Sequence, residues 1–63
     1  MSGTLIIKQV KGSEIRVSGT HISNVTKALR YIGQRWEQGD IDPTSIEYYE
    51  GDVKQFTMEI HTP

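Results

Sequence analysis

The sequence predicts a two-layer α+β domain in which a single helix packs on a four-stranded, mainly antiparallel sheet, in the order β-β-α-β-β. Two segments near the start of the chain and two near its end alternate apolar and polar residues or are rich in β-branched residues, as is typical of strands. Between them, one segment carries apolar residues at helical spacing. Because typical domains have about 100–150 residues, we expect residues 1–63 to form one small domain.

The first two segments, residues 4–10 and 14–18, predict a β-hairpin, with Gly12 in the turn between them. The length of this turn decides which side chains share a face. A two-residue turn would put the even-numbered side chains of the first strand on the face of Ile15, whereas a three-residue turn would put Leu5 there. The sequence leaves both registers open.

The middle of the chain predicts the helix. Its apolar residues recur at intervals of three and four and should form one buried stripe: Ile22, Val25, Leu29, Ile32 and Trp36. Thr20 and Ser23 are both candidate N-caps, because a hydroxyl there can accept a hydrogen bond from a free backbone N–H. Gly39 is expected to end the helix, and Pro43 prevents it from resuming.

The last two segments, residues 45–49 and 53–61, predict a second hairpin. A two-residue turn at 51–52 would split the apolar face of this hairpin. A three-residue turn sets Ile46 opposite Phe56 and keeps the apolar residues together, so we expect the three-residue turn.

The net charge of −1 conceals an uneven distribution of charge. Six of the seven Lys and Arg residues lie within residues 1–35, and seven of the eight Asp and Glu residues lie within residues 36–63. Such an asymmetry indicates an interaction surface, unless folding mixes the two halves.

The acidic half supplies the first candidate surface. Six acidic residues follow one another without an intervening basic residue: Glu37, Asp40, Asp42, Glu47, Glu50 and Asp52. An acidic surface of this kind can engage a basic groove on a partner protein.

The sheet face that the helix leaves bare should carry polar residues and Tyr49, a residue type enriched at interfaces. Together, the acidic surface and this face predict a non-catalytic protein-binding module that acts as a small regulator or inhibitor of a larger protein or complex. In size and layout the chain looks like small phage-encoded proteins that bind and inhibit host machinery. A structural homo-oligomeric subunit is an alternative, because a small domain gains much from association.

A second alternative is a small nucleic-acid-binding protein. The solvent-facing side of the helix carries Lys27, Arg30 and Arg35, which could contact phosphates, and Tyr31, which could stack on a base.

Several functions are not expected. Neither His21 nor His61 has a partner residue at a spacing that builds a catalytic triad or a metal site, and the chain has no cysteine. We therefore expect no enzyme activity, no cofactor and no metal. The longest apolar run, residues 5–7, is far shorter than the roughly 20 residues of a membrane span, and no secretory signal is recognisable. The expected location is the cytoplasm, of the cell or of an infected host, with no membrane partner.

Overall fold

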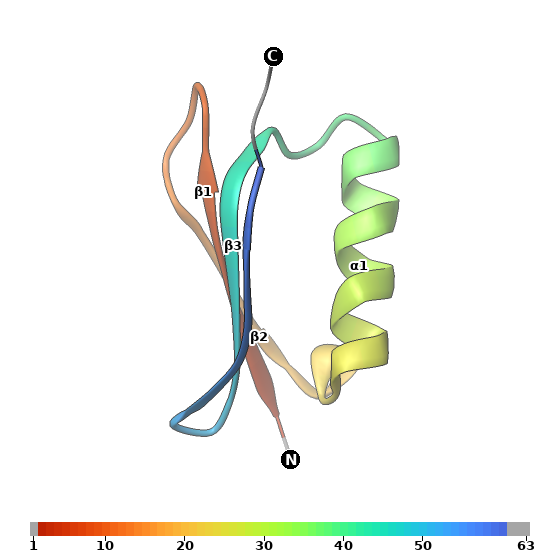
Figure 1. The fold of residues 1–63 in the computed structure, drawn as a ribbon. Helices are drawn as coiled ribbons and strands as arrows, with labels where there is room; N and C mark the ends of the chain where they lie inside the picture. The colour runs from red at the N-terminus through yellow and green to blue at the C-terminus, as the bar shows by residue number, and fades with distance from the viewer. Residues whose placement is uncertain (1, 61–63) are drawn as a thin grey trace.

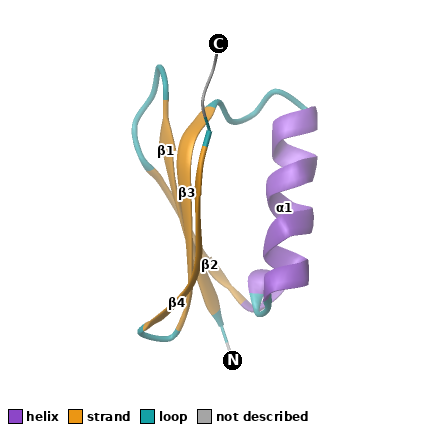
Figure 2. Ribbon diagram, viewed as in Figure 1, coloured by secondary structure: helices purple, strands orange, loops and turns teal. Residues whose placement is uncertain are grey.

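The computed structural model describes residues 2–60. In chain order, the elements are β1 (Gly3–Gln9), β2 (Ile15–Gly19), the 3-10 helix η1 (Thr20–Ile22), α1 (Val25–Glu37), β3 (Pro43–Glu50) and β4 (Val53–Glu59) (Figure 1). The expected α+β class is confirmed, because one α-helix lies against one face of a four-stranded antiparallel sheet (Figure 2). The short helix η1 is an element that the sequence pattern did not predict.

The sheet has the strand order β2-β1-β3-β4, so β1 and β3 are central and β2 and β4 are the edges. Leu5 and Ile7 of β1 face α1 and are fully buried, whereas Ile6 points to the other face and is half-buried. The three consecutive apolar residues of β1 therefore belong to a central strand that is fully covered on one side only.

The first hairpin has a longer loop than either of the two expected. Leu5 pairs with Val17, so the odd-numbered apolar residues of both strands share the helix-facing side. This is the face relation of the three-residue turn, but the pairing stops early and residues 8–14 form the connection. The Gln9 side chain supports this connection, since its amide nitrogen donates to the backbone oxygen of Ser13 over 3.0 Å.

The expected three-residue turn of the second hairpin is wrong. The turn has only two residues, 51–52, and a β-bulge then shifts the register within the hairpin. Gln55 is the extra residue, and beyond it Phe56 pairs with Tyr48 rather than with Ile46. The bulge keeps the apolar side chains of the hairpin on one face despite the two-residue turn. The extra residue moves each following side chain of β4 to the opposite face of the sheet.

The helix begins later than expected. Asn24 is the N-cap of α1, and its Oδ1 accepts a hydrogen bond from the backbone N–H of Lys27 over 2.9 Å. The expectation that Thr20 or Ser23 caps this helix is wrong, because η1 occupies the preceding residues and Ser23 ends it. Gly39 follows the helix with a φ of 77°, which confirms it as the residue that ends α1.

The core lies between α1 and the sheet. Its buried residues are Leu5, Ile7, Ile22, Ala28, Ile32, Ile41, Ile46 and Tyr48. Tyr48 is the largest of them, and its hydroxyl donates a hydrogen bond to the backbone oxygen of Ile22 over 2.8 Å. This bond ties the central strand β3 to the turn that precedes the helix, so the only polar atom of that side chain is satisfied.

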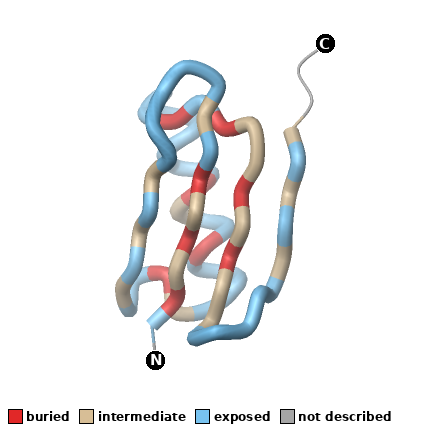
Figure 3. The backbone as a smooth tube through the Cα atoms, turned by 90° about the vertical axis from the view of Figure 1, so that its left-hand side faces the viewer, coloured by how far each residue is buried: buried red, intermediate tan, exposed pale blue. Residues whose placement is uncertain are grey.

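The expectation that the whole helical stripe is buried is wrong for three residues. The exposed fractions are 37% for Val25, 46% for Leu29 and 45% for Trp36, whereas Ala28 and Ile32 are buried. Figure 3 shows the reason: the helix passes behind the other three strands and leaves β4 uncovered at one side of the sheet. The helix is therefore centred on Ala28 and Ile32, and the described residues cover one flank of its apolar stripe only partly.

Candidate functional site

Five of the six acidic residues predicted as one surface are divided between the two ends of the molecule, and the sixth, Glu47, lies between them on β3. One group lies at the end of α1 and in the loop that follows: Glu37, Asp40 and Asp42. The other lies at the turn between β3 and β4: Glu50 and Asp52. Figure 1 shows this loop and this turn at opposite ends of the sheet. The fold therefore does not bring the acidic residues into one patch.

Two of the acidic residues are neutralised by nearby basic residues. Asp40 forms an ion pair with Arg35 over 3.1 Å. The hydrogen bond that Arg35 donates to Asp40 raises the pKa of Arg35. Glu47, on the outer face of β3, forms an ion pair with Lys54 over 2.8 Å. The hydrogen bond from Lys54 lowers the pKa of Glu47, although partial burial opposes this shift.

Tyr49 belongs to the same outer-face cluster as Glu47. Its hydroxyl donates to Glu47 Oε2 over 3.3 Å, and Lys54 Nζ lies 5.8 Å from the centre of its ring. These three side chains satisfy one another on a face that carries polar residues and the half-buried Ile6, so this part of the outer sheet face offers little unsatisfied charge to a partner.

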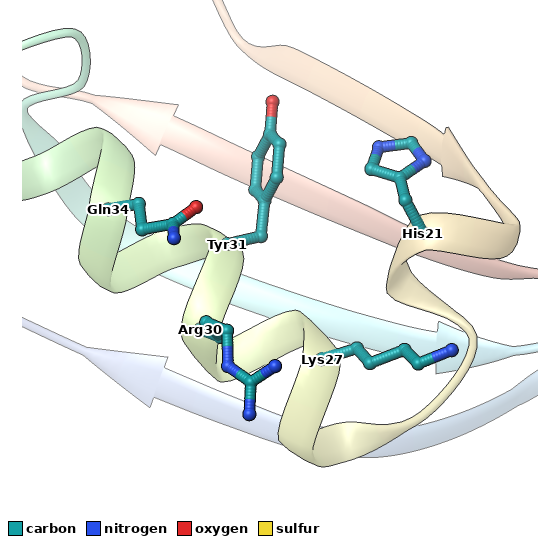
Figure 4. Close-up of a pocket in the computed structure, with 5 residues that line it drawn as sticks. All are labelled: His21, Lys27, Arg30, Tyr31 and Gln34. Atoms are coloured by element: carbon teal, nitrogen blue, oxygen red, sulfur yellow. The ribbon is translucent and has the colours of Figure 1, made fainter.

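The exposed flank of α1 lies on the side of β4. Figure 4 shows Tyr31 and His21 on the side of the helix that faces β2. Helical geometry turns each residue by about 100°, so Leu29 and Trp36 project from the opposite flank, the one nearer β4. Val25 belongs to the same flank.

The facing side chains of β4 are also incompletely covered. Phe56 and Met58 are half-buried and share the helix-facing side of the sheet with Tyr48 and Ile46. The ring of Phe56 packs 5.4 Å from that of Tyr48. We call the five residues on this side of the molecule the apolar strip: Val25, Leu29, Trp36, Phe56 and Met58. Sequence periodicity assigned all three helical members to the core.

The apolar strip borders an open sheet edge. β4 has β3 on one side and no strand on the other within residues 2–60. Its backbone groups on the outer side are therefore available to a further strand. β2, the other edge, is shorter, and its half-buried residues Ile15 and Val17 pack against the core on the side where Tyr31 also packs.

A second candidate site is a surface pocket of about 300 Å³ on the other flank of α1. It is lined by five side chains: His21, Lys27, Arg30, Tyr31 and Gln34 (Figure 4). The fold thus brings together three of the four residues proposed for nucleic-acid contact. The fourth, Arg35, does not line the pocket but lies over the Tyr31 ring, 5.3 Å from its centre.

Two lining residues were not among the predicted contact residues. Gln34 follows Arg30 and Tyr31 by four and three positions, so helical spacing alone could have grouped it with them. His21 comes from η1, whose position no sequence signal indicated. Its ring packs edge-on against Tyr31 with a centroid distance of 5.6 Å.

The residues between 2 and 60 include no cluster of metal-ligating side chains. No group of three or more histidine or acidic residues in this range could hold a metal ion, and none of its acidic, basic or histidine side chains is buried. His61 lies outside the described residues. None of the helices described is both long and apolar enough to cross a membrane.

Comparison with models of protein families, with curated proteins and with solved structures found no match for this chain.

Proposed function

We propose that the chain is a non-catalytic protein-binding module, a small regulator or inhibitor that takes an extended segment of a larger protein as an additional strand beside β4. One observation carries this proposal: the apolar strip lies exposed beside the open edge of the sheet. In this mode of recognition, main-chain hydrogen bonds to the edge strand supply affinity, and alternate side chains of the segment supply specificity.

The edge beyond the bulge suits strand addition. From Phe56 onward β4 pairs with β3 without a further irregularity, so its outer side runs straight for several residues. A segment added there would project every second side chain toward the helix, where Leu29 and Trp36 are nearly half exposed. Apolar side chains at those positions would cover the strip and remove it from water.

The acidic residues supply a second criterion for the partner. The strip has acidic residues at both ends: Glu50 and Asp52 at the turn before β4, and Glu37 and Asp42 near the end of α1. None of these four side chains forms a salt bridge within residues 2–60. A segment with lysine or arginine on either side of its apolar residues would complement this charge.

The same charge argues against a second copy of the chain as the occupant. In an antiparallel β4–β4 pair, Glu59 of each copy would lie beside the acidic turn, Glu50 to Asp52, of the other copy. Like charges placed side by side across paired strands are destabilising. A basic partner segment avoids this repulsion.

Selection from a library of random displayed peptides tests the proposal. We expect enriched peptides to alternate apolar residues and to carry flanking lysine or arginine. Binding should move the emission of Trp36, the only tryptophan, to shorter wavelength, because a bound segment covers it.

Two variants and one control locate the binding. Leu29→Glu places a charge in the apolar strip, so the affinity should fall at least about tenfold, and Asp52→Lys should weaken binding and reduce its salt dependence. Arg16→Glu on the exposed edge strand β2 is the control and should leave the affinity unchanged. Enrichment without the apolar and basic pattern, or equal affinity of Leu29→Glu, would contradict the proposal. If the chain instead formed concentration-dependent dimers and Leu29→Glu abolished them, the occupant of the β4 edge would be a second copy of the chain and not a partner segment.

A further inference from the structure

The pocket on the β2 side of α1 has a different chemistry from the apolar strip. Two of its five lining residues, Lys27 and Arg30, are cations, and no acidic residue lines it. Neither cation forms a salt bridge within residues 2–60. The pocket therefore presents positive charge that the described part of the protein does not neutralise, although the whole chain has a net charge of −1.

The ring of Tyr31, which lines the pocket, is held in place by its neighbours. Tyr31 packs partly against the core, and its ring lies between the edge contact with His21 and the guanidinium of Arg35. Arg35 is itself fixed by Asp40 over 3.1 Å. Arg35 therefore supports the ring of Tyr31 while its own charge is balanced by Asp40.

We propose that this pocket binds one phosphate-linked nucleotide unit of a single-stranded nucleic acid. Lys27 and Arg30 would contact the phosphate, since lysine and arginine are its usual partners. His21 and Tyr31 offer aromatic surface to the base, and the Gln34 amide can donate and accept at the base edge. A volume of about 300 Å³ lies at the lower end of the range for small-ligand pockets and suits one such unit.

A single strand fits the pocket better than a duplex. Its bases are unstacked and can enter a pocket beside the backbone phosphates, whereas the bases of a duplex are already paired and stacked. The pocket and the apolar strip occupy opposite flanks of α1, so this inference is independent of the proposed protein binding.

The test is fluorescence anisotropy with a labelled single-stranded oligothymidylate, titrated between about 50 and about 200 mM salt. Each phosphate contact to a single strand contributes about −0.7 to the slope of log K against log salt, so contacts from Lys27 and Arg30 predict a slope of about −1.4. For Lys27→Gln/Arg30→Gln we expect a slope near zero and at least about tenfold weaker binding at the lower salt concentration.

A matched control removes the same charge elsewhere. Lys8→Gln/Lys11→Gln changes two exposed lysines at the β1–β2 end of the molecule, and it should leave the slope unchanged. Gln34→Ala should weaken binding of the oligonucleotide but not of an abasic strand of equal length. Circular dichroism of each variant establishes that it is folded.

Several results would overturn the inference. These are no binding at the lower salt concentration, an equal loss in the control variant, or displacement of the oligonucleotide by inorganic phosphate at similar concentration, which would indicate only a general anion site. Thymidine monophosphate binding as tightly as the oligonucleotide would also overturn it, because the ligand would then be a free nucleotide.

Discussion

Replacing Tyr48 with phenylalanine removes one atom from the centre of the fold and tests how the helix is attached to the sheet. The Tyr48 side chain is fully buried, and its hydroxyl donates to the backbone oxygen of Ile22 over 2.8 Å. In Tyr48→Phe the ring still packs against Phe56, but the buried carbonyl loses this donor. Leaving a buried acceptor without its partner costs about 1–3 kcal/mol.

This cost is large for so small a domain. At about 0.05–0.15 kcal/mol per residue, a chain of this length has a free energy of unfolding of about 3–9 kcal/mol. Each kcal/mol lowers the Tm of a domain of this size by about 4–8 °C, so the Tm should fall by at least about 4 °C. Urea denaturation followed by circular dichroism measures the free energy, and a thermal scan measures the Tm.

Tyr49→Phe is the matched control, because it removes the hydroxyl of a neighbouring tyrosine on the outer face. That hydroxyl donates to the partly exposed Glu47 over 3.3 Å, so its loss should change the free energy of unfolding by less than about 0.5 kcal/mol. Equal stability of Tyr48→Phe and the wild type would refute the assignment of a structural role to the Tyr48–Ile22 bond.

The same residue predicts a dependence on pH. Burial, and to a lesser degree the charge of Glu50, raises the pKa of Tyr48 above its ordinary value. Below the unfolded-state pKa of about 10, Tyr48 keeps its proton in both the folded and the unfolded state, and its contribution to the free energy of unfolding is fully present. As the pH rises from about 10 through the folded-state pKa, the unfolded state ionises first and this stabilisation is lost. We expect the stability of the wild type to fall more steeply over this range than that of Tyr48→Phe, and parallel curves would contradict the expectation.

Five further substitutions test the packing and the helix cap. Gly3→Ala should cost about 1–3 kcal/mol, because a Cβ there would overlap the backbone oxygen of Ile22 and the ring of Tyr48; a fully stable variant in chemical denaturation would contradict this contact. Asn24→Ala should cost about 1 kcal/mol through loss of the helix cap, and Asn24→Ser should restore most of it, as measured by thermal unfolding. Ile32→Ala should cost about 2–4 kcal/mol, whereas Leu29→Gln should cost less than about 1 kcal/mol, and the reverse order in urea denaturation would show that the helix is rotated from its described position.

The sequence predicted the kinds of elements and most of the side chains that face the core, because both follow from local periodicity. It could not predict the rotation of the helix on the sheet. A stripe with spacing three and four specifies an apolar face about 100° wide, but the strands behind the helix decide which part of that face is buried. Leu29 and Trp36 therefore satisfy the pattern and are nevertheless exposed.

The register of the second hairpin was mispredicted for a similar reason. The argument against a two-residue turn assumed that β3 and β4 pair without a bulge. The extra residue Gln55 breaks this assumption, because it returns the apolar side chains to one face after a two-residue turn. A bulge has no strong sequence signature, so turn and bulge could not be separated before the fold was known.

The candidate sites show the same division between local and long-range information. Lys27, Arg30 and Tyr31 were predicted to act together and do line one pocket, because they lie within little more than one helical turn. The acidic residues come from the end of α1, a loop, β3 and a turn. Because β3 runs between Asp42 and Asp52, it places these two residues at opposite ends of the sheet.

Amide hydrogen exchange of β4 tests the central claim, that a partner segment is added to this edge. The measurement compares the chain alone with the chain bound to a peptide selected as described above. We expect exchange to slow along the outer side of β4, from Phe56 to Glu59, and to remain unchanged in the other edge strand, β2. Slower exchange only in β2, or only at residues on the sheet face away from the helix, with exchange in β4 unchanged, would contradict the account.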